Sequence, residues 1–213
     1  MVQPFTPIVV DTNCFLRLLD WEPRPFVGQV VGAFKLVTTE KLVVEAQSPE
    51  LQDRYPKLKN PLVQRELKAA ALRYPPVQQK ALAKETDEFR ELANGLLAAV
   101  CIEQQTHIRA LSRVDASLWA TAVHAKGALA TDEWPLTLAA ERIPFDDDEN
   151  YIQVFSSVHL LHMLEAAGKL DAAGRWNMMR QWRQENEYLH RDADTQYLQL
   201  FGEAPPNAQS PKK

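Results

Sequence analysis

The sequence predicts an α/β fold built around a parallel sheet, and three observations support this prediction. Residues 7–10 (Pro-Ile-Val-Val) form a continuously apolar, largely β-branched run, which is typical of a strand buried on both faces. The segments 36–38 and 128–130 are also short and largely apolar. Helical patterns separate the three segments, and strands that alternate with helices indicate βαβ units and a parallel sheet.

The segments between these strands are predicted in order along the chain. Helices are expected at residues 14–19, 40–47, 77–107, 112–125 and 136–141. Thr12 or Asn13 is expected to cap the first of these helices, since both residue types are favoured there. The stretch 48–76 contains five prolines, so it is predicted to be an irregular or short-helical excursion. Residues 143–145 are predicted to be an edge strand, because proline is tolerated at sheet edges.

The character of the chain changes after residue 150. Residues 151–202 have an entirely helical pattern, and residues 203–213 are rich in proline and polar residues, which is typical of a disordered tail. We therefore expect a first domain at 1–150, with the basic insertion 48–76 inside it. A helical C-terminal extension at 151–202 is expected to pack on that domain.

Composition excludes several classes of protein. The 213 residues are 46% apolar and 24% charged, with a net charge of −4. This net charge does not decide for or against nucleic-acid binding, because cations bound by a cluster of acids invert the local charge. Cys14 and Cys101 are too few for a disulfide-stabilised scaffold and lack zinc-ligand spacing. The sequence shows neither a signal peptide nor a long apolar span, so the cytoplasm is the expected location.

Acidic residues follow two of the predicted strands at the point where each strand ends. Asp11 comes directly after the first strand, and Asp132 and Glu133 follow the strand at 128–130. Ligands of open α/β sheets bind outside the carboxyl ends of the strands. We therefore expect Asp11 and the Asp132/Glu133 pair to lie on the same rim of the sheet.

Two further acids are candidates for the same rim. Asp115 lies in the first turn of the helix that begins near Ser112, and Glu45 lies one to two turns into the helix after the second strand. Each acid also has a structural alternative. Asp115 and Ser112 have the spacing of a capping box, Asp132 could be a helix N-cap, and Glu45 could be a solvated residue on an amphipathic helix.

Gathered carboxylates would have a chemical consequence. Two carboxylates ~4 Å apart repel by roughly 4 kcal/mol at an effective dielectric constant near 20, whereas a whole domain is stable by only about 5–15 kcal/mol. Such a cluster needs protons or a cation, and hard oxygen ligands favour Mg²⁺ or Mn²⁺. Cations held in this way activate water and stabilise charge on a phosphodiester. The expected chemistry is therefore hydrolysis.

Four segments, in chain order, resemble the motifs of the PIN-domain family of nucleases. They are Ile8 to Asn13, Thr38 to Glu45, Leu111 to Leu118 with Ala120, and Gly127 to Trp134. The resemblance covers residues 7–146. It implies a three-layer α/β/α sandwich with a central parallel sheet. It also implies metal-dependent cleavage of RNA that leaves a 5′-phosphate and a 3′-hydroxyl.

The same resemblance implies roles for individual residues. The implied metal ligands and catalytic acids are Asp11, Glu45, Asp115 and one of the neighbours Asp132 and Glu133. The fourth acid of the family usually lies two residues after the threonine, which is the position of Glu133, but Asp132 lies between them and stays a candidate. Glu40 is a rival to Glu45. Thr12, Asn13, Ser112 and Thr131 would orient carboxylates or bound water.

The insertion and the extension offer two candidate surfaces for RNA. Basic residues of the insertion that could contact phosphate are Arg54, Lys57, Lys59, Arg65, Lys68 and Arg73, although a merely solvated basic face is an equal alternative. In the extension, Trp176 and Trp182 lie among arginines and could stack on bases. The alternative is that Trp176, Met179 and Trp182 pack the extension onto the first domain.

Three hypotheses about function follow. The first is an active endoribonuclease, either a growth-inhibiting toxin with an antitoxin partner or an RNA-processing or defence enzyme. The second is a nuclease of the same fold that acts on DNA flaps or ends. The third is a catalytically inactive PIN scaffold that binds RNA or a protein partner. Homodimers are common in the family, so a second copy of the chain is also a candidate partner.

Overall fold

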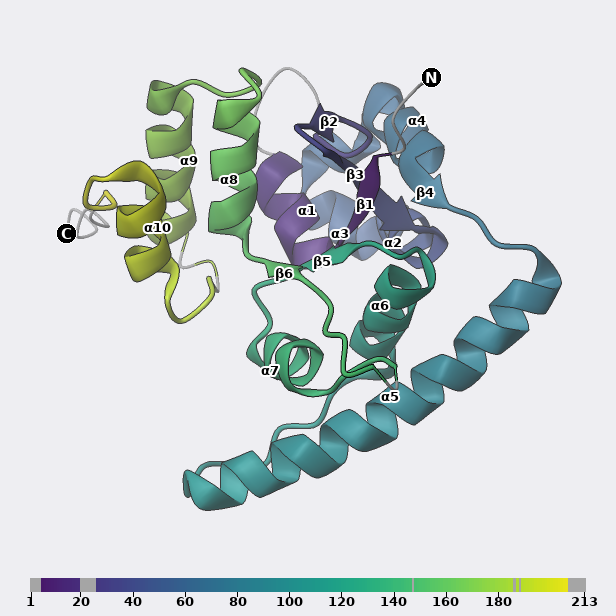
Figure 1. Ribbon diagram of the computed structural model, residues 1–213. Coiled ribbons are helices and arrows are strands. Elements are labelled where there is room, and N and C mark those ends of the chain that lie inside the picture. The colour runs from purple at the N-terminus through teal and green to yellow at the C-terminus, as the bar shows by residue number, and fades with distance from the viewer. Residues whose placement is uncertain (1–4, 20–25, 147, 186, 188, 207–213) are drawn as a thin grey trace.

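The computed structural model describes residues 5–19, 26–146, 148–185, 187 and 189–206, and a sheet lies at its centre (Figure 1). The strands are β1 (Thr6–Val10), β2 (Val30–Val31), β3 (Phe34–Thr39), β4 (Ala71–Leu72), β5 (Ala128–Ala130) and β6 (Val154–Phe155). Their order is β2-β3-β1-β5-β6, and β4 also pairs with β3. The β2–β3 pairing is antiparallel and the other pairings are parallel. The sheet is therefore mixed and mostly parallel, whereas an all-parallel sheet was expected.

Helices make up most of the remaining described chain. They are α1 (Thr12–Leu19), α2 (Glu40–Glu45), α3 (Pro49–Arg54), the 3₁₀ helix η1 (Pro56–Lys59), α4 (Pro61–Ala70), α5 (Pro76–Glu103), α6 (Arg113–His124), α7 (Trp134–Arg142), α8 (Ser157–Ala166), α9 (Ala172–Gln184) and α10 (Ala193–Phe201). The prolines of the insertion start helices rather than interrupt them, since Pro49 and Pro61 occupy first helical positions where no hydrogen-bond donor is lost. Among the residues described, no helix has both the length and the apolar character needed to cross a membrane.

Successive side chains of a strand point to opposite faces of the sheet, and a separate hydrophobic core lies on each face. Ile8 and Val10 point into one core, where helices α1, α2, α4 and α8–α10 pack. Val9 points into the other core, which α5, α6 and α7 cover. Helices thus cover both faces of the sheet, an arrangement compatible with a three-layer α/β/α sandwich.

The last strand of the sheet lies in a segment where no strand was expected. The prediction of an edge strand at 143–145 is wrong: Ile143 caps the end of α7, and the N–H of Phe145 donates to the carbonyl of Asn150 in a turn. Instead β6, which belongs to the stretch predicted to be entirely helical, pairs in parallel with β5. A two-residue strand leaves no readable period in the sequence, which explains the error.

The C-terminal helices pack against α1 through apolar side chains (Figure 1). Met179 and Trp182 are fully buried in the core that α1 shares with α8–α10. The Trp182 indole N–H donates to the Arg17 carbonyl at 3.3 Å. Trp176, by contrast, is 38% exposed. Packing therefore accounts for Met179 and Trp182, whereas Trp176, the third residue of this set, keeps an accessible ring.

The first residues of the predicted disordered tail have specific contacts. Arg175 forms an ion pair with Glu203 at 2.7 Å, and Arg183 donates to the carbonyl of Pro206 at 2.8 Å. The Arg175 guanidinium also lies 4.0 Å from the ring centroid of Phe201. Residues 203–206 are thus held by specific contacts, and the rest of the predicted tail, 207–213, lies outside the described residues.

Candidate active site

A cavity of about 360 Å³ opens beside the carboxyl ends of β1 and β5, where α1 and α6 begin. Four of the predicted acids line it, together with a fifth carboxylate and one arginine. These six residues are Asp11, Glu45, Asp115, Glu133, Glu187 and Arg54. The fold therefore brings carboxylates from distant parts of the sequence to one hollow, and Arg54 is the cation among the described residues that line it.

Asp11 is the most buried of these carboxylates, with an exposed fraction of 3%. Its N–H donates to the carbonyl of Ala130, which ties the end of β1 to the end of β5. One carboxylate oxygen accepts from the Cys14 N–H at 2.6 Å, so Asp11 itself caps α1 and the expected cap at Thr12 or Asn13 is wrong. The other oxygen accepts from the Thr131 hydroxyl at 2.5 Å.

Burial makes the charge on Asp11 costly. Desolvation raises the pKa of this carboxyl to about 6, although the hydrogen bonds from Thr131 and Cys14 lower the pKa in part. The charged form is stabilised by opposite charge and penalised by loss of water. A cation beside Asp11 would therefore stabilise the ionised carboxylate and offset the free energy of its desolvation.

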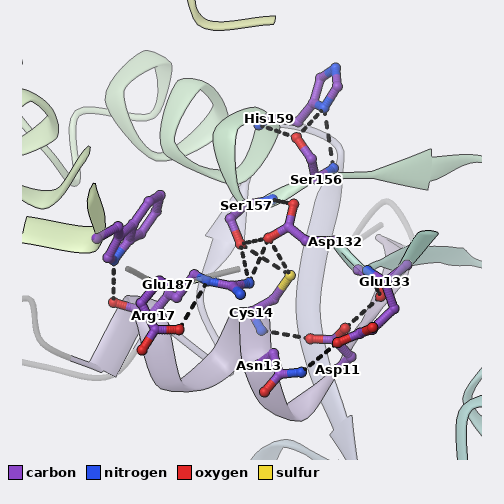
Figure 2. A network of polar contacts seen from close by, with 12 residues as sticks. Asp11, Asn13, Cys14, Arg17, Asp132, Glu133, Ser156, Ser157, His159 and Glu187 are labelled. Atoms are coloured by element: carbon purple, nitrogen blue, oxygen red, sulfur yellow. Dashed lines mark hydrogen bonds and ion pairs between the residues drawn. The ribbon is translucent and has the colours of Figure 1, made fainter. Parts of the chain in front are cut away.

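The adjacent acids Asp132 and Glu133 point in different directions (Figure 2). Asp132 is 1% exposed and accepts from Arg17 at 2.6 Å and from the Ser157 hydroxyl at 2.5 Å. The Ser157 N–H also donates to it at 3.1 Å. Glu133 instead lines the cavity and accepts from the Asn13 side chain at 2.9 Å. The structure thus places Glu133 in the carboxylate cavity and Asp132 in a buried ion pair.

Glu45 and Asp115 are each held by a neighbouring hydroxyl. The Thr12 hydroxyl donates to Glu45 at 2.7 Å, and the Ser112 hydroxyl donates to Asp115 at 2.7 Å. Ser112 also accepts from the Asp115 N–H, so it is the N-cap of α6. The capping role and the cavity-lining position of Asp115 therefore coexist. Glu40, the rival of Glu45, does not line this cavity.

The carboxylates surround the cavity without converging on one point. Within the described ranges, no group of three or more histidine, cysteine, aspartate or glutamate side chains is close enough to hold a metal ion as it stands. Glu45, Asp115 and Glu133 each accept a hydrogen bond from a separate neighbour. The donor set nevertheless fits Mg²⁺ or Mn²⁺, because five of the described residues that line the cavity are carboxylates.

Glu187 is a cavity residue that the sequence did not predict. It lies in the loop between α9 and α10, and its carboxylate is 3.7 Å from the Arg17 guanidinium. Arg17 therefore contacts both the buried Asp132 and a residue of the C-terminal extension. No sequence signal marks Glu187, because its relation to the cavity exists only after α9 has packed against α1.

The basic residues of the insertion separate into groups. Arg54 lines the carboxylate cavity, and Lys57 lies in an adjoining groove. Lys59 and Arg73 form surface ion pairs with acids, at 2.8 Å and 3.8 Å respectively. Exposed side chains of α4 that line neither hollow are Arg65 and Lys68. Two of the six predicted basic residues therefore line hollows at or beside the carboxylates, and two are paired with surface acids.

Comparisons of the chain with protein-family models, with curated proteins and with solved structures found no match. Any proposal about function therefore rests on the arrangement and chemistry of these side chains, and on the resemblance of the four sequence segments to PIN-domain motifs.

Proposed function

We propose that the protein is a divalent-metal-dependent endoribonuclease of the PIN type, which hydrolyses RNA to products with a 5′-phosphate and a 3′-hydroxyl. The observation that carries this proposal is the cavity at the carboxyl edge of the sheet. It is lined by Asp11, Glu45, Asp115 and Glu133, the positions of the four PIN-like acids. Asp132 is not part of the proposed ligand set, because Arg17 and Ser157 already engage it.

The four carboxylates would hold Mg²⁺ or Mn²⁺, with Asp11 as the buried anchor. A bound ion supplies Lewis acidity, activates water and stabilises charge on the phosphodiester. The chain's own polar residues would keep the carboxylates in place: Thr131 holds Asp11, Thr12 holds Glu45, and Asn13 holds Glu133. Such outer hydrogen bonds orient ligands and tune a metal site.

The choice of RNA over DNA follows from the resemblance alone. Within it, the growth-inhibiting toxin and the RNA-processing or defence enzyme are two cellular roles for the same reaction. A toxin predicts poor growth on expression, relieved by an antitoxin partner. The alternatives are a DNA nuclease of the same fold and an inactive scaffold that binds RNA or a protein.

A cleavage assay with purified variants tests the proposal. With Mn²⁺ and a labelled single-stranded RNA, we expect Asp11→Asn and Asp115→Asn to lower the cleavage rate by more than about 100-fold, since loss of an outer-shell partner alone costs about 10–100-fold. The matched control Glu91→Gln removes an exposed charge from α5 and should cleave at the wild-type rate. Cleavage by both aspartate variants at that rate would overturn the proposal.

Two controls separate this outcome from loss of folding and from the alternatives. In a chelator at pH 8, Asp11→Asn should unfold at no lower temperature than the wild type, because the substitution removes a desolvated charge. Parallel assays on RNA, single-stranded DNA and duplex DNA identify the substrate class. Calorimetry with Mn²⁺ addresses the scaffold hypothesis, which predicts no binding of the ion.

A further inference from the structure

A groove of about 490 Å³ adjoins the carboxylate cavity on the side of the C-terminal helices. One wall comes from α3 and η1 in the insertion, and the other from α9 and the loop that follows it. Arg54, Tyr55 and Glu187 line both the groove and the carboxylate cavity. The two hollows therefore adjoin each other at these three residues, and a chain that crossed the carboxylates could extend past them into the groove.

The insertion wall carries groups that suit a single nucleic-acid strand. The Arg54 guanidinium lies 5.3 Å from the centroid of the Tyr55 ring, and Lys57 lies two residues further along the same wall. Both cations belong to exposed residues. Arginine and lysine contact phosphates, and aromatic rings provide stacking surfaces for bases.

The opposite wall supplies an amide and two carboxylates. Gln181 of α9 donates to Glu185 at 3.0 Å, and Glu187 lies 3.7 Å from the Arg17 guanidinium. Both carboxylates on this wall are therefore engaged by donors of the protein. The cations of the groove therefore lie on the insertion wall, and Gln181 lies with the two carboxylates on the opposite wall.

We propose that this groove binds the single-stranded RNA segment that flanks the scissile phosphodiester, with phosphates toward Arg54 and Lys57 and Gln181 on the opposite side. The proposal rests on the proposed function of the carboxylate cavity and extends it. The insertion and the C-terminal extension each contribute one wall, so the extension is part of the substrate-binding surface. The groove volume is within the range of sites that hold ligands of nucleotide size.

Binding measurements on paired variants test the insertion wall. Anisotropy of a labelled 12-nucleotide single-stranded RNA, in Mg²⁺ and on the Asp115→Asn background, reports affinity without cleavage. Arg54→Ala/Lys57→Ala should weaken binding about 10-fold or more and lower the salt slope of log K by about 1.4, which corresponds to about 0.7 per lost phosphate contact on a single strand. Arg65→Ala/Lys68→Ala removes the same residue types from α4 and should change the affinity less than about 3-fold.

A second pair of variants tests the wall from the extension. Gln181→Glu places a negative charge in the groove and should weaken RNA binding, whereas Gln181→Lys should strengthen it, because phosphate contacts dominate affinity. The matched control Gln184→Glu adds the same charge to an exposed position of α9 that does not line the groove. Equal affinity of Gln181→Glu, Gln181→Lys and Gln184→Glu would overturn the proposed role of α9.

A small substrate separates failure of the groove from failure of the proposed function. Bis(p-nitrophenyl) phosphate contains a phosphodiester without flanking nucleotides. If the groove binds the flank, the loss of kcat/KM caused by Arg54→Ala/Lys57→Ala should be at least about 10-fold greater for RNA than for this compound. Equal losses would overturn the groove assignment. If the wild-type protein hydrolyses neither substrate, the proposed function fails, and the binding measurements still decide whether RNA occupies the groove.

Discussion

Two neighbouring acids, Asp132 and Glu133, are placed in opposite environments by the geometry of an extended chain. Side chains alternate between the faces of a strand, and Ala128 and Ala130 point into the core that contains α1 and α8. Asp132 lies on the same side of the chain as these two alanines and pairs with Arg17 of α1. Glu133 lies on the other side of the chain and lines the cavity. The sequence could therefore have predicted that the two acids point to opposite sides, if the alternation of the strand at 128–130 had been continued to Asp132 and Glu133.

Neutralising each acid should therefore have different consequences. Asp132→Asn leaves the Arg17 charge buried without its closest partner, so we expect a loss of stability of about 3–5 kcal/mol. Glu133→Gln should change stability by less than about 0.5 kcal/mol but abolish metal-dependent cleavage. Urea unfolding and a cleavage assay on both variants measure the two effects. An inactive, fully stable Asp132→Asn together with an active Glu133→Gln would reverse the assignment.

At the scale of elements, the N-terminus of α8 contains a pH-sensitive cap. The backbone N–H of Ser156 donates to Nδ1 of the His159 ring at 3.2 Å, and the Ser156 hydroxyl accepts from the backbone N–H of His159. These two hydrogen bonds form a capping box. Burial lowers the pKa of His159 from its usual value of 6.5, His190 and His162 lower it further, and Asp132 opposes them. The folded protein therefore favours the neutral ring, which can accept the hydrogen bond.

The sign of the pH dependence follows from that lowered pKa. The stabilising contribution of neutral His159 is fully present above pH 6.5 and is lost as the pH falls through the lower folded-state pKa. Glutamine can complete the same capping box without titrating. We expect His159→Gln to lose less stability than the wild type between pH 7.5 and pH 5.5, measured as urea midpoints. Identical losses in the two proteins would show that folding does not lower the pKa of His159.

The approach of β5 to β1 depends on a glycine. A Cβ atom on Gly127 would lie 2.3 Å from the Pro7 carbonyl oxygen, a clash with backbone that no side-chain movement relieves. Gly127→Ala should therefore destabilise the protein by more than about 2 kcal/mol, as overpacked sites do. The control Gly95→Ala meets nothing within 4 Å in α5 and should stabilise by about 0.5–1 kcal/mol. Thermal unfolding compares them, and a Gly127→Ala protein as stable as the wild type would contradict this packing.

The elements that the sequence predicted best are those with long or strongly apolar patterns. Strand β1, helix α6 and strand β5 lie within about a residue of their expected positions. Strands β2, β4 and β6 have two residues each, too few to show a period. The insertion was expected to be irregular or short-helical, and it is short-helical, with side chains such as Ser48 and Asn60 capping its helices. These caps are local signals that could have been read from the sequence.

At the scale of the whole molecule, the C-terminal extension completes structures that begin in the first 150 residues. Strand β6 extends the sheet beyond β5, and α8–α10 share one core with α1. Ser157 and Arg17 also jointly enclose Asp132. Sequence alone could suggest that the extension packs on the first domain. It could not show that β6 joins the sheet, or that Glu187 and Gln181 line the hollows beside the carboxylates, since both depend on tertiary packing.

A chain that ends at residue 150 should therefore fail to fold. It would lose β6 and expose the α1 face of the core, which includes Phe15 and Leu18. We expect no cooperative thermal transition by circular dichroism and strong binding of a hydrophobic dye, the features of a state without fixed packing. A truncated protein that unfolds cooperatively and cleaves RNA would show that residues 1–150 are an independent nuclease domain.

The claim on which the proposed function depends is that Asp11, Glu45, Asp115 and Glu133 together bind a divalent cation. Anomalous diffraction from crystals soaked in Mn²⁺ measures this directly, because the ion's position is located independently of any activity. We predict an anomalous peak in the cavity, with carboxylate oxygens of at least Asp11 and one further acid as ligands. Crystals saturated with Mn²⁺ that show no peak in this cavity would contradict the claim.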